Sequence, residues 1–237
     1  MEHQQPGVQR GVPPTGHQTW LLPRALRLPL LLLPPLLLAI LEILHPNPDA
    51  TVAALMDVAT WFAVFHAIQL VLLGLVALSV VLLADSYGYA SAWTTRIGLG
   101  VFLVFFSAYD TIAGIGTGLA MRSARDLTTE QQEGVFSVVK DWPGLDWPFA
   151  LSIIGTGGWL VAVGALALAA RRRGAPRSEW IFLALAAFFL LGGHPFPAGT
   201  LAFGCLFAAA LLREWPMGGS AERGRSSPDT TPDTTPG

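Results

Sequence analysis

The chain is poor in charged residues and has almost no cysteine. Only 13% of its 237 residues are charged, about half of the ~25% usual for a soluble domain, whereas 52% are hydrophobic. The single cysteine, Cys205, excludes an intrachain disulfide and a metal site built from cysteines. A formal net charge of −2 gives no basic signal of nucleic-acid binding, so we predict no nucleic-acid partner.

Familiar catalytic motifs are also missing. The chain contains no Gly-x-Ser-x-Gly, no phosphate-binding loop, no His-Glu-x-x-His and no dinucleotide fingerprint. No reaction follows from a motif, and whether the protein is an enzyme stays open at this stage. The functional interpretation therefore depends on the few ionisable residues that lie inside apolar segments.

Six apolar runs make up more than half of the chain. Each has a tryptophan near one end, where the apolar ring and polar N–H favour the boundary between hydrocarbon and water. This pattern predicts an all-α, polytopic membrane protein, a six-transmembrane-helix bundle over residues 20–214, with the lipid bilayer of a bacterial-type plasma (inner) membrane as its partner. The runs are Leu28–Leu44, Val58–Ala84, Ile97–Met121, Trp147–Ala170, Ser178–Gly193 and Pro195–Leu212, and the tryptophans are Trp20, Trp61, Trp93, Trp147, Trp180 and Trp215.

The fifth and sixth runs are short, and only a three-residue turn at Gly193 separates them. Spanning about 30 Å of hydrocarbon takes about twenty helical residues. These two runs therefore form either a complete tight hairpin or a pair that does not fully cross. Both alternatives return the chain to the side from which it entered.

The distribution of basic residues predicts the orientation. Eleven of the fourteen lie in the two terminal segments and in the second and fourth loops, whereas Arg122, Arg125 and Lys140 lie in the third loop. Basic residues favour the cytoplasmic side, so both termini are predicted to be cytoplasmic and loop 122–146 external. The polar ends, 1–19 and 215–237, are predicted to be disordered, and the external loop to carry a short surface helix with Asp126 as its N-cap.

The first run contains Pro29, Pro34 and Pro35. Proline removes a backbone donor and clashes with the preceding turn, so we expect this helix to bend near its middle. Each carbonyl that loses its helical partner must find another donor inside the protein.

A repeated tetrapeptide predicts a close contact between two helices. The sequence Ile-Gly-Thr-Gly occurs at 115–118 and again at 154–157, in the third and fourth runs. Glycines let two backbones approach where lipid supplies no hydrophobic drive. Gly118 and Gly155 are therefore predicted to lie in one contact between the third and fourth runs.

Five ionisable residues lie in or beside the runs, and with cytoplasmic termini all would be in the outer half of the bilayer or at its outer surface: Glu42, His45, His66, Asp110 and His194. His66 and Asp110 share helical faces with small residues, which is typical of a packing face. We therefore expect a polar pocket that opens outward. Its predicted ligand-binding residues are His66, Asp110, Gln69, Ser107 and His194.

Three interpretations of this pocket stay open. His66 and Asp110 can form a structural hydrogen bond between helices, worth at most about 1–2 kcal/mol. The Glu-x-x-His spacing of Glu42 and His45 places both on one helix face, and with His66 and Asp110 they would suit a metal ion, while two histidines would suit a haem. A carboxylate near a histidine can also relay protons or hold a small solute.

The leading expectation is an integral membrane protein that binds, senses or conducts a small solute or proton, or serves as an accessory subunit of a membrane complex. The alternative is a metal- or haem-dependent membrane enzyme that uses Glu42, His45, His66 and Asp110. The run Arg171–Arg173 is expected to anchor the topology at the inner lipid surface, where it can also contact anionic headgroups.

Overall fold

A computed structural model describes residues 22–46, 51–142 and 145–215 of the chain. Throughout this part the protein is helical and contains no strand. Residues 1–21 and 216–237 lie outside the described ranges, as do the predictions of disorder at the two ends that fall on them. The all-α fold class is confirmed.

Within the described ranges, four continuous helices are long and apolar enough to cross a membrane. The third of them runs through a π-helical segment, η2, without a break, and continues as α4. These four are α1 (Arg24–Ile43), α2 (Val52–Ala84), the composite of α3 (Tyr89–Asp110), η2 (Thr111–Gly116) and α4 (Thr117–Ser123), and α6 (Asp146–Arg172).

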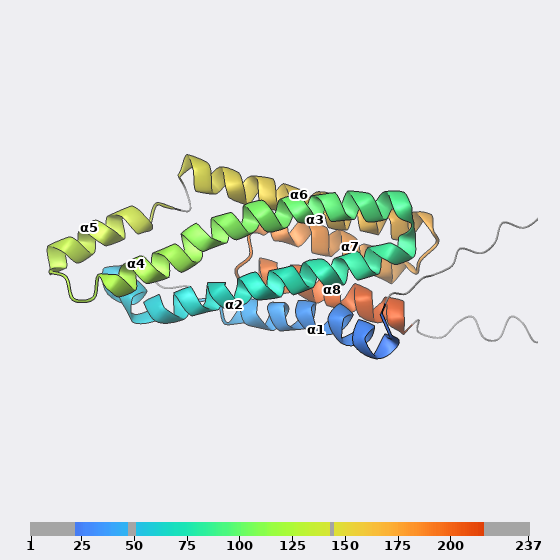
Figure 1. The fold of residues 1–237 in the computed structure, drawn as a ribbon, viewed down its shortest axis with the longest axis horizontal. Coiled ribbons are helices and arrows are strands. Elements are labelled where there is room, and N and C mark those ends of the chain that lie inside the picture. The colour runs from blue at the N-terminus through green and yellow to red at the C-terminus, as the bar shows by residue number, and fades with distance from the viewer. Residues whose placement is uncertain (1–21, 47–50, 143–144, 216–237) are drawn as a thin grey trace, which may run out of the picture.

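The fifth and sixth apolar runs fold as a shorter hairpin. α7 (Arg177–Phe189) and α8 (Ala198–Glu214) are joined through the 3-10 turn η4 (Leu190–Gly192). With 13 and 17 residues, neither helix has the length of the four long ones. The hairpin turn accordingly lies partway along the long helices (Figure 1).

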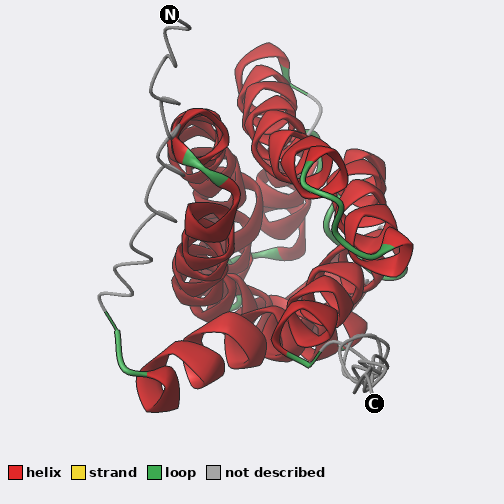
Figure 2. Cartoon of the chain, turned by 90° about the vertical axis from the view of Figure 1, so that its right-hand side faces the viewer, coloured by secondary structure: helices red, strands yellow, loops and turns green. Residues whose placement is uncertain are grey.

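The bundle pairs α3 with α6, places α2 between α1 and α3, and packs α7 and α8 against α6 and α1 (Figures 1 and 2). Its core is aliphatic and aromatic, and the side chain of Trp159 is completely buried in it. The indole N–H of Trp159 donates to the Ala186 carbonyl at 2.9 Å, so the buried polar group is satisfied. α6 and α7 are thus joined by a hydrogen bond as well as by packing.

One end of the bundle, which we call the basic end, carries the starts of α1, α3 and α7 and the ends of α2, α6 and α8 (Figure 1). Ion pairs join these elements. Arg27 lies 2.6 Å from Glu214, and Arg96 lies 2.7 Å from Asp85. The Tyr87 hydroxyl donates to the carboxylate of Glu179.

The opposite end, the far end, extends beyond α1 and the α7–α8 hairpin (Figure 1). A second small core there, formed by Leu55, Ala59, Met121 and Val139, joins the first turns of α2 to α4 and α5 (Thr129–Val139). The predicted short helix between residues 122 and 146 is therefore present. Its N-cap is Thr128 rather than Asp126, because Thr128 and Gln131 form a reciprocal capping box.

α1 stays helical through its three prolines. Pro34 has no N–H, so the carbonyl of Leu30, four residues earlier, loses its helical donor. The hydroxyl of Ser79 on α2 donates to that carbonyl at 2.5 Å. The expected partner for a freed carbonyl is thus confirmed, and the bend itself stays a prediction.

Gly118 and Gly155 of the repeated tetrapeptide lie in different helix contacts. Gly155 packs against the backbone of Phe106 on α3, which is the predicted pair of runs. Gly118 packs against the backbones of Ala59 and Ala63 on α2, so a shared contact with the fourth run is wrong for this residue. The reason is that α4 continues beyond the α3–α6 contact and meets the first turns of α2 instead.

Candidate functional site

The polar residues predicted from the sequence meet where α1 ends, α2 and α3 pass, and the hairpin turns into α8. Four of them are less than a tenth exposed: Glu42 (0%), His66 (2%), Asp110 (1%) and His194 (8%). His45 follows the last turn of α1 and is half-buried. Elements separated by up to 152 residues in the sequence thus contribute to one cluster.

Three imidazoles form the centre of this cluster. His45, His66 and His194 each offer one ring nitrogen, and these three atoms all lie within 4.8 Å of one another. The centroid of the His45 ring is 5.3 Å from that of His66 and 5.0 Å from that of His194. The rings meet edge to face, and Phe65 packs against His45 with a centroid distance of 4.9 Å.

The orientation of His66 is fixed from two sides. Its Nδ1 lies 2.7 Å from the carbonyl of Phe62, one turn earlier on α2, to which a protonated Nδ1 donates. Nε2 then carries the lone pair and lies 3.8 Å from Asp110 Oδ1. The ring rests on Gly114, where any Cβ would overlap it. The π-helical segment after Asp110 contains this glycine, so it provides the space that the imidazole occupies.

His194 lies between two carboxylates. Its Nδ1 is 3.4 Å from Glu42 Oε2 and its Nε2 is 3.6 Å from Asp110 Oδ1. The turn that carries His194 is closely packed, because a Cβ on Gly199 would overlap the carbonyl of His194 and approach Glu42. Each nitrogen of the ring therefore faces an acidic oxygen.

Gln69 completes the polar wall on α2. Its Nε2 lies 3.1 Å from Glu42 Oε1 and also 3.1 Å from His194 Nδ1. The amide thus holds the Glu42 carboxylate beside the ring of His194. Ser107 is different: it is half-buried on α3, and among the described residues its hydroxyl makes no hydrogen bond to this cluster.

Several buried polar atoms of the cluster have no hydrogen-bond partner within the described ranges. They include both carboxylate oxygens of Asp110, both ring nitrogens of His45 and Oε1 of Gln69. A buried polar group without a partner costs free energy, so native proteins usually satisfy such atoms with protein, water or a ligand. These unpaired atoms surround the meeting point of the three histidines.

The environment of His45 favours its neutral form. Burial, together with the positive charge that His194 and His66 would carry, lowers the pKa of His45 from 6.5 to about 3. At neutral pH this ring therefore keeps a lone pair available. A neutral imidazole is the form that binds transition metals.

The structure brings together all the predicted site residues except Ser107. It also adds the Phe62 carbonyl, Gly114 and Gly199, which the sequence analysis missed. The contact with the Phe62 carbonyl could have been predicted, since residue 62 lies four positions before His66 on one helix. Gly114 follows Asp110 by four residues and therefore shares its helix face, whereas Gly199 had no such signal because its contacts join different elements.

Chemically, the cluster offers three imidazole nitrogens and two carboxylates in a nearly dry setting. Such a donor set suits Zn²⁺ or Fe²⁺. No protein-family model matches the chain, and the searches of curated proteins and of solved structures also gave no match. The chemistry of the site therefore has to be inferred from its geometry.

Proposed function

We propose that this chain is a metal-binding membrane protein whose centre is formed by His45, His66, His194 and Asp110. The observation that carries the proposal is the convergence of three histidine nitrogens within 4.8 Å, each from a different part of the chain. Tetrahedral zinc with metal–nitrogen bonds of about 2.0–2.1 Å holds its ligand atoms about 3.3 Å apart. Small movements of the three histidine side chains would bring their ring nitrogens to that separation.

The fourth ligand in this proposal is a carboxylate oxygen of Asp110. Its Oδ1 lies within 3.8 Å of nitrogens on both His66 and His194, and it lacks a hydrogen-bond partner in the described part of the chain. A metal between these atoms would satisfy the carboxylate and accept the lone pairs of the rings. The same ion would offset the cost of burying the charge of Asp110.

The surroundings of the rings support the same proposal. Histidines that bind metals usually donate their second N–H to a carbonyl or a carboxylate, which fixes the tautomer. The Phe62 carbonyl takes this place for His66 and the Glu42 carboxylate takes it for His194. Gln69 holds Glu42 in position. Glu42, which the sequence placed among the ligands, is thus proposed as an orienting residue.

The proposed membrane placement follows from helix lengths. α1 has 20 residues and α2 has 33, which correspond to about 30 Å and about 50 Å. If α1 spans the hydrocarbon of about 30 Å, the metal centre lies at the outer boundary and the far-end helices cover it. We propose six passes with a bent first helix, both termini in the cytoplasm of a bacterial-type cell, and the α7–α8 hairpin as the last two passes.

A second candidate function is a proton relay or a small-solute site without metal. The row Asp110–His194–Glu42 favours it, because one imidazole joins two buried carboxylates at 3.6 Å and 3.4 Å. A histidine in such a position can pass a proton between them. Both candidates use the same residues, and metal content distinguishes them.

The test is a metal titration of the purified protein in detergent, after chelator treatment and with Cys205→Ala as the background. We expect one Zn²⁺ per chain, and no stoichiometric Zn²⁺ in His66→Ala or His194→Ala. Glu179→Gln, at the basic end, is the matched control for purification and folding. A wild-type chain that takes up no metal, or histidine variants that bind Zn²⁺ normally, would overturn the proposal; the first result with intact folding would favour the proton relay.

Orientation has its own test. Glu133 is exposed on α5, and Ser227 lies in the C-terminal segment. In the Cys205→Ala background, a membrane-impermeant thiol reagent applied to intact cells should modify Glu133→Cys and leave Ser227→Cys unmodified. The reverse pattern would place the metal centre on the cytoplasmic side.

A further inference from the structure

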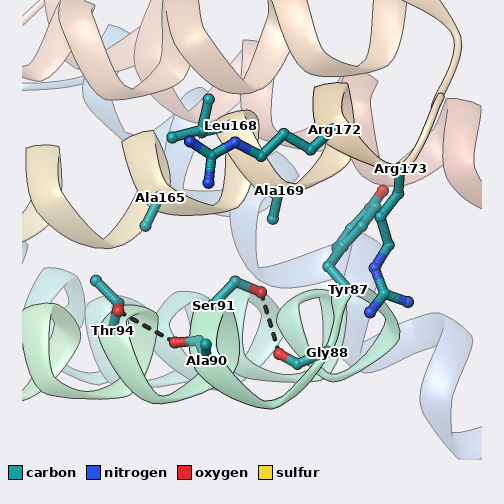
Figure 3. Close-up of a pocket in the computed structure, with 10 residues that line it drawn as sticks. All are labelled: Tyr87, Gly88, Ala90, Ser91, Thr94, Ala165, Leu168, Ala169, Arg172 and Arg173. Carbon is teal, nitrogen blue, oxygen red and sulfur yellow. Dashed lines mark hydrogen bonds between the residues drawn. The ribbon is translucent and has the colours of Figure 1, made fainter.

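A groove in the outer wall of the bundle at the basic end is separate from the metal centre. It lies between the first turns of α3 and the last turns of α6 and has a volume of about 470 Å³. Small-molecule sites commonly measure about 300–1,000 Å³. Figure 3 shows its residues: Tyr87, Gly88, Ala90, Ser91, Thr94, Ala165, Leu168, Ala169, Arg172 and Arg173.

The groove exists because two closely packed helices have small side chains at this level. Nearer the bundle centre α3 and α6 touch through their backbones, since a Cβ on Gly98 would lie 2.7 Å from the Gly158 carbonyl. Thr95 strengthens that contact by donating to the Ala162 carbonyl at 3.1 Å. One to two turns further toward the basic end, alanines and a serine leave the space between the helices unfilled.

The two arginines place positive charge at two points of the groove, beside Leu168 and beside Gly88 (Figure 3). Arg172 lies along α6 toward Leu168, and Arg173 reaches across to Gly88 at the start of α3 (Figure 3). Gly88 has a φ of 101°, and a Cβ there would overlap the Arg173 guanidinium. Within the described ranges neither arginine forms an ion pair with an acidic side chain, unlike Arg27 and Arg96.

The floor of the groove is largely apolar. Ser91 and Thr94 contribute hydroxyls, and they already donate at 3.1 Å to the carbonyls of Gly88 and Ala90 (Figure 3). Beyond them Ala165 and the exposed Leu168 lead along α6 toward the middle of the bundle. A ligand here would meet the positive charge of Arg172 and Arg173 as well as the methyl groups of Ala165 and Leu168.

We propose that this groove binds an anionic glycerophospholipid, with Arg172 and Arg173 turning toward its phosphate from the α6 side and an acyl chain along Ala165 and Leu168. The positive charge of the two arginines favours an anionic ligand, because basic pockets between helices near the membrane surface attract anionic headgroups. The apolar floor selects a lipid over free phosphate. The binding does not depend on the metal centre; only the assignment to the cytoplasmic leaflet rests on the topology proposed above.

Native mass spectrometry of the full chain in mild detergent tests the proposal with dioleoyl-phosphatidylglycerol and dioleoyl-phosphatidylcholine as probes. We expect one retained phosphatidylglycerol and weaker retention of phosphatidylcholine. Arg172→Gln combined with Arg173→Gln should weaken phosphatidylglycerol binding about thirtyfold, which corresponds to about fivefold for each arginine. Arg177→Gln, an exposed arginine outside the groove, is the matched charge control.

A second variant blocks the apolar part without changing charge. Ala165→Phe should fill the floor and lower phosphatidylglycerol binding, whereas Val161→Phe, exposed on the same helix but outside the groove, should not. Equal binding of both lipids, or normal phosphatidylglycerol binding by either groove variant, would overturn the proposal. Displacement of the lipid by excess inorganic phosphate alone would identify a phosphate site instead.

Discussion

The carboxylates at the basic end and those in the polar cluster where α1 ends have different partners. At the basic end, Glu214 lies 2.6 Å from Arg27, and Asp85 lies 2.7 Å from Arg96. In the polar cluster where α1 ends, Glu42 and Asp110 face imidazoles at separations of 3.4 Å to 3.8 Å. Ordinary nitrogen–oxygen hydrogen bonds measure about 2.7–3.2 Å. The carboxylates at the basic end are thus paired with arginine at contact distance, whereas the imidazole–carboxylate separations in the cluster are longer and, among the described residues, only Gln69 contacts the Glu42 carboxylate within that range, at 3.1 Å.

The chemistry of the partners explains this difference. Arginine is always charged and cannot release its proton, so an arginine–carboxylate pair is complete without a ligand. Imidazole changes charge near neutral pH and is also a common metal ligand. Asp110, whose carboxylate oxygens face imidazoles and have no hydrogen-bond partner in the described residues, is therefore expected to be stabilised by a proton or by a metal ion. We therefore expect the arginine–carboxylate pairs to be structural and the imidazole–carboxylate cluster to hold the proposed metal ion.

The largest effect that tests this contrast is expected from Asp110→Asn. Structural zinc sites contribute about 10–16 kcal/mol in total, so one of four ligands accounts for about 3–4 kcal/mol, or several hundredfold in affinity. We expect a loss of that size in competition titrations with a zinc-binding dye. Glu179→Gln makes the same carboxyl-to-amide change at the basic end and should leave zinc affinity unchanged. Equal losses of zinc affinity in Asp110→Asn and Glu179→Gln would contradict the proposed difference between the two regions.

The next effect concerns stability at the basic end. The side chains of Arg27 and Glu214 are only 11% and 8% exposed, so Arg27→Met leaves a nearly buried carboxylate without this partner. We expect a loss of about 3 kcal/mol in the free energy of unfolding, measured by denaturant titration in mixed micelles. Added zinc should not restore it.

Arg96→Met is the control for that change. The pair Arg96–Asp85 is 38% and 39% exposed, and exposed pairs contribute about 0–1 kcal/mol. Similar losses in the two arginine variants would mean that burial does not decide the strength of these pairs.

A smaller change in the metal centre is expected from Gly114→Ala. The added methyl group overlaps the His66 ring, so the ring must turn away from Asp110. Disturbing the support of a metal ligand costs about 10–100-fold in affinity, and we expect a zinc affinity reduced by about tenfold in the same titration. Gly100→Ala on α3 adds a methyl group that meets nothing within 4 Å and should bind zinc normally.

The difference between the two regions could be predicted only in part from the sequence. Apolar runs of about twenty residues predicted the long helices, because helix length and hydropathy are local properties. Ionisable residues inside such runs are rare and costly, and this rarity alone identified Glu42, His66 and Asp110 as site residues. No tertiary information was needed for either inference.

Other features depended on depth and on contacts between distant elements. His194 was placed in an external turn, yet it is 8% exposed, because the short α7–α8 hairpin turns at the level of Glu42. Gly118 and Gly155 occur in identical tetrapeptides but pack against different helices. The groove at Arg172 and Arg173 is formed by small residues on two helices. The sequence of either helix alone does not predict it.

The smallest expected effect lies between the two ends, at Ser79. Its hydroxyl donates to the Leu30 carbonyl that Pro34 leaves without a helical partner, and also lies 3.0 Å from the carbonyl of Leu75. Ser79→Ala removes the donor and leaves the Leu30 carbonyl unsatisfied inside the bundle. We expect a loss of about 1 kcal/mol in unfolding free energy, since hydrogen bonds between membrane helices average about 0.6 kcal/mol and reach about 1.7.

The matched control for Ser79→Ala is Ser91→Ala, which removes a hydroxyl that donates only to the nearby Gly88 carbonyl on its own helix. It should change stability by less than the Ser79 variant. The double variant Ser79→Ala with Pro34→Ala restores a backbone donor four residues after Leu30 and should recover most of the loss. Recovery would show that the α1–α2 hydrogen bond exists because of the proline; an unchanged loss would show that Ser79 stabilises α2 by other contacts.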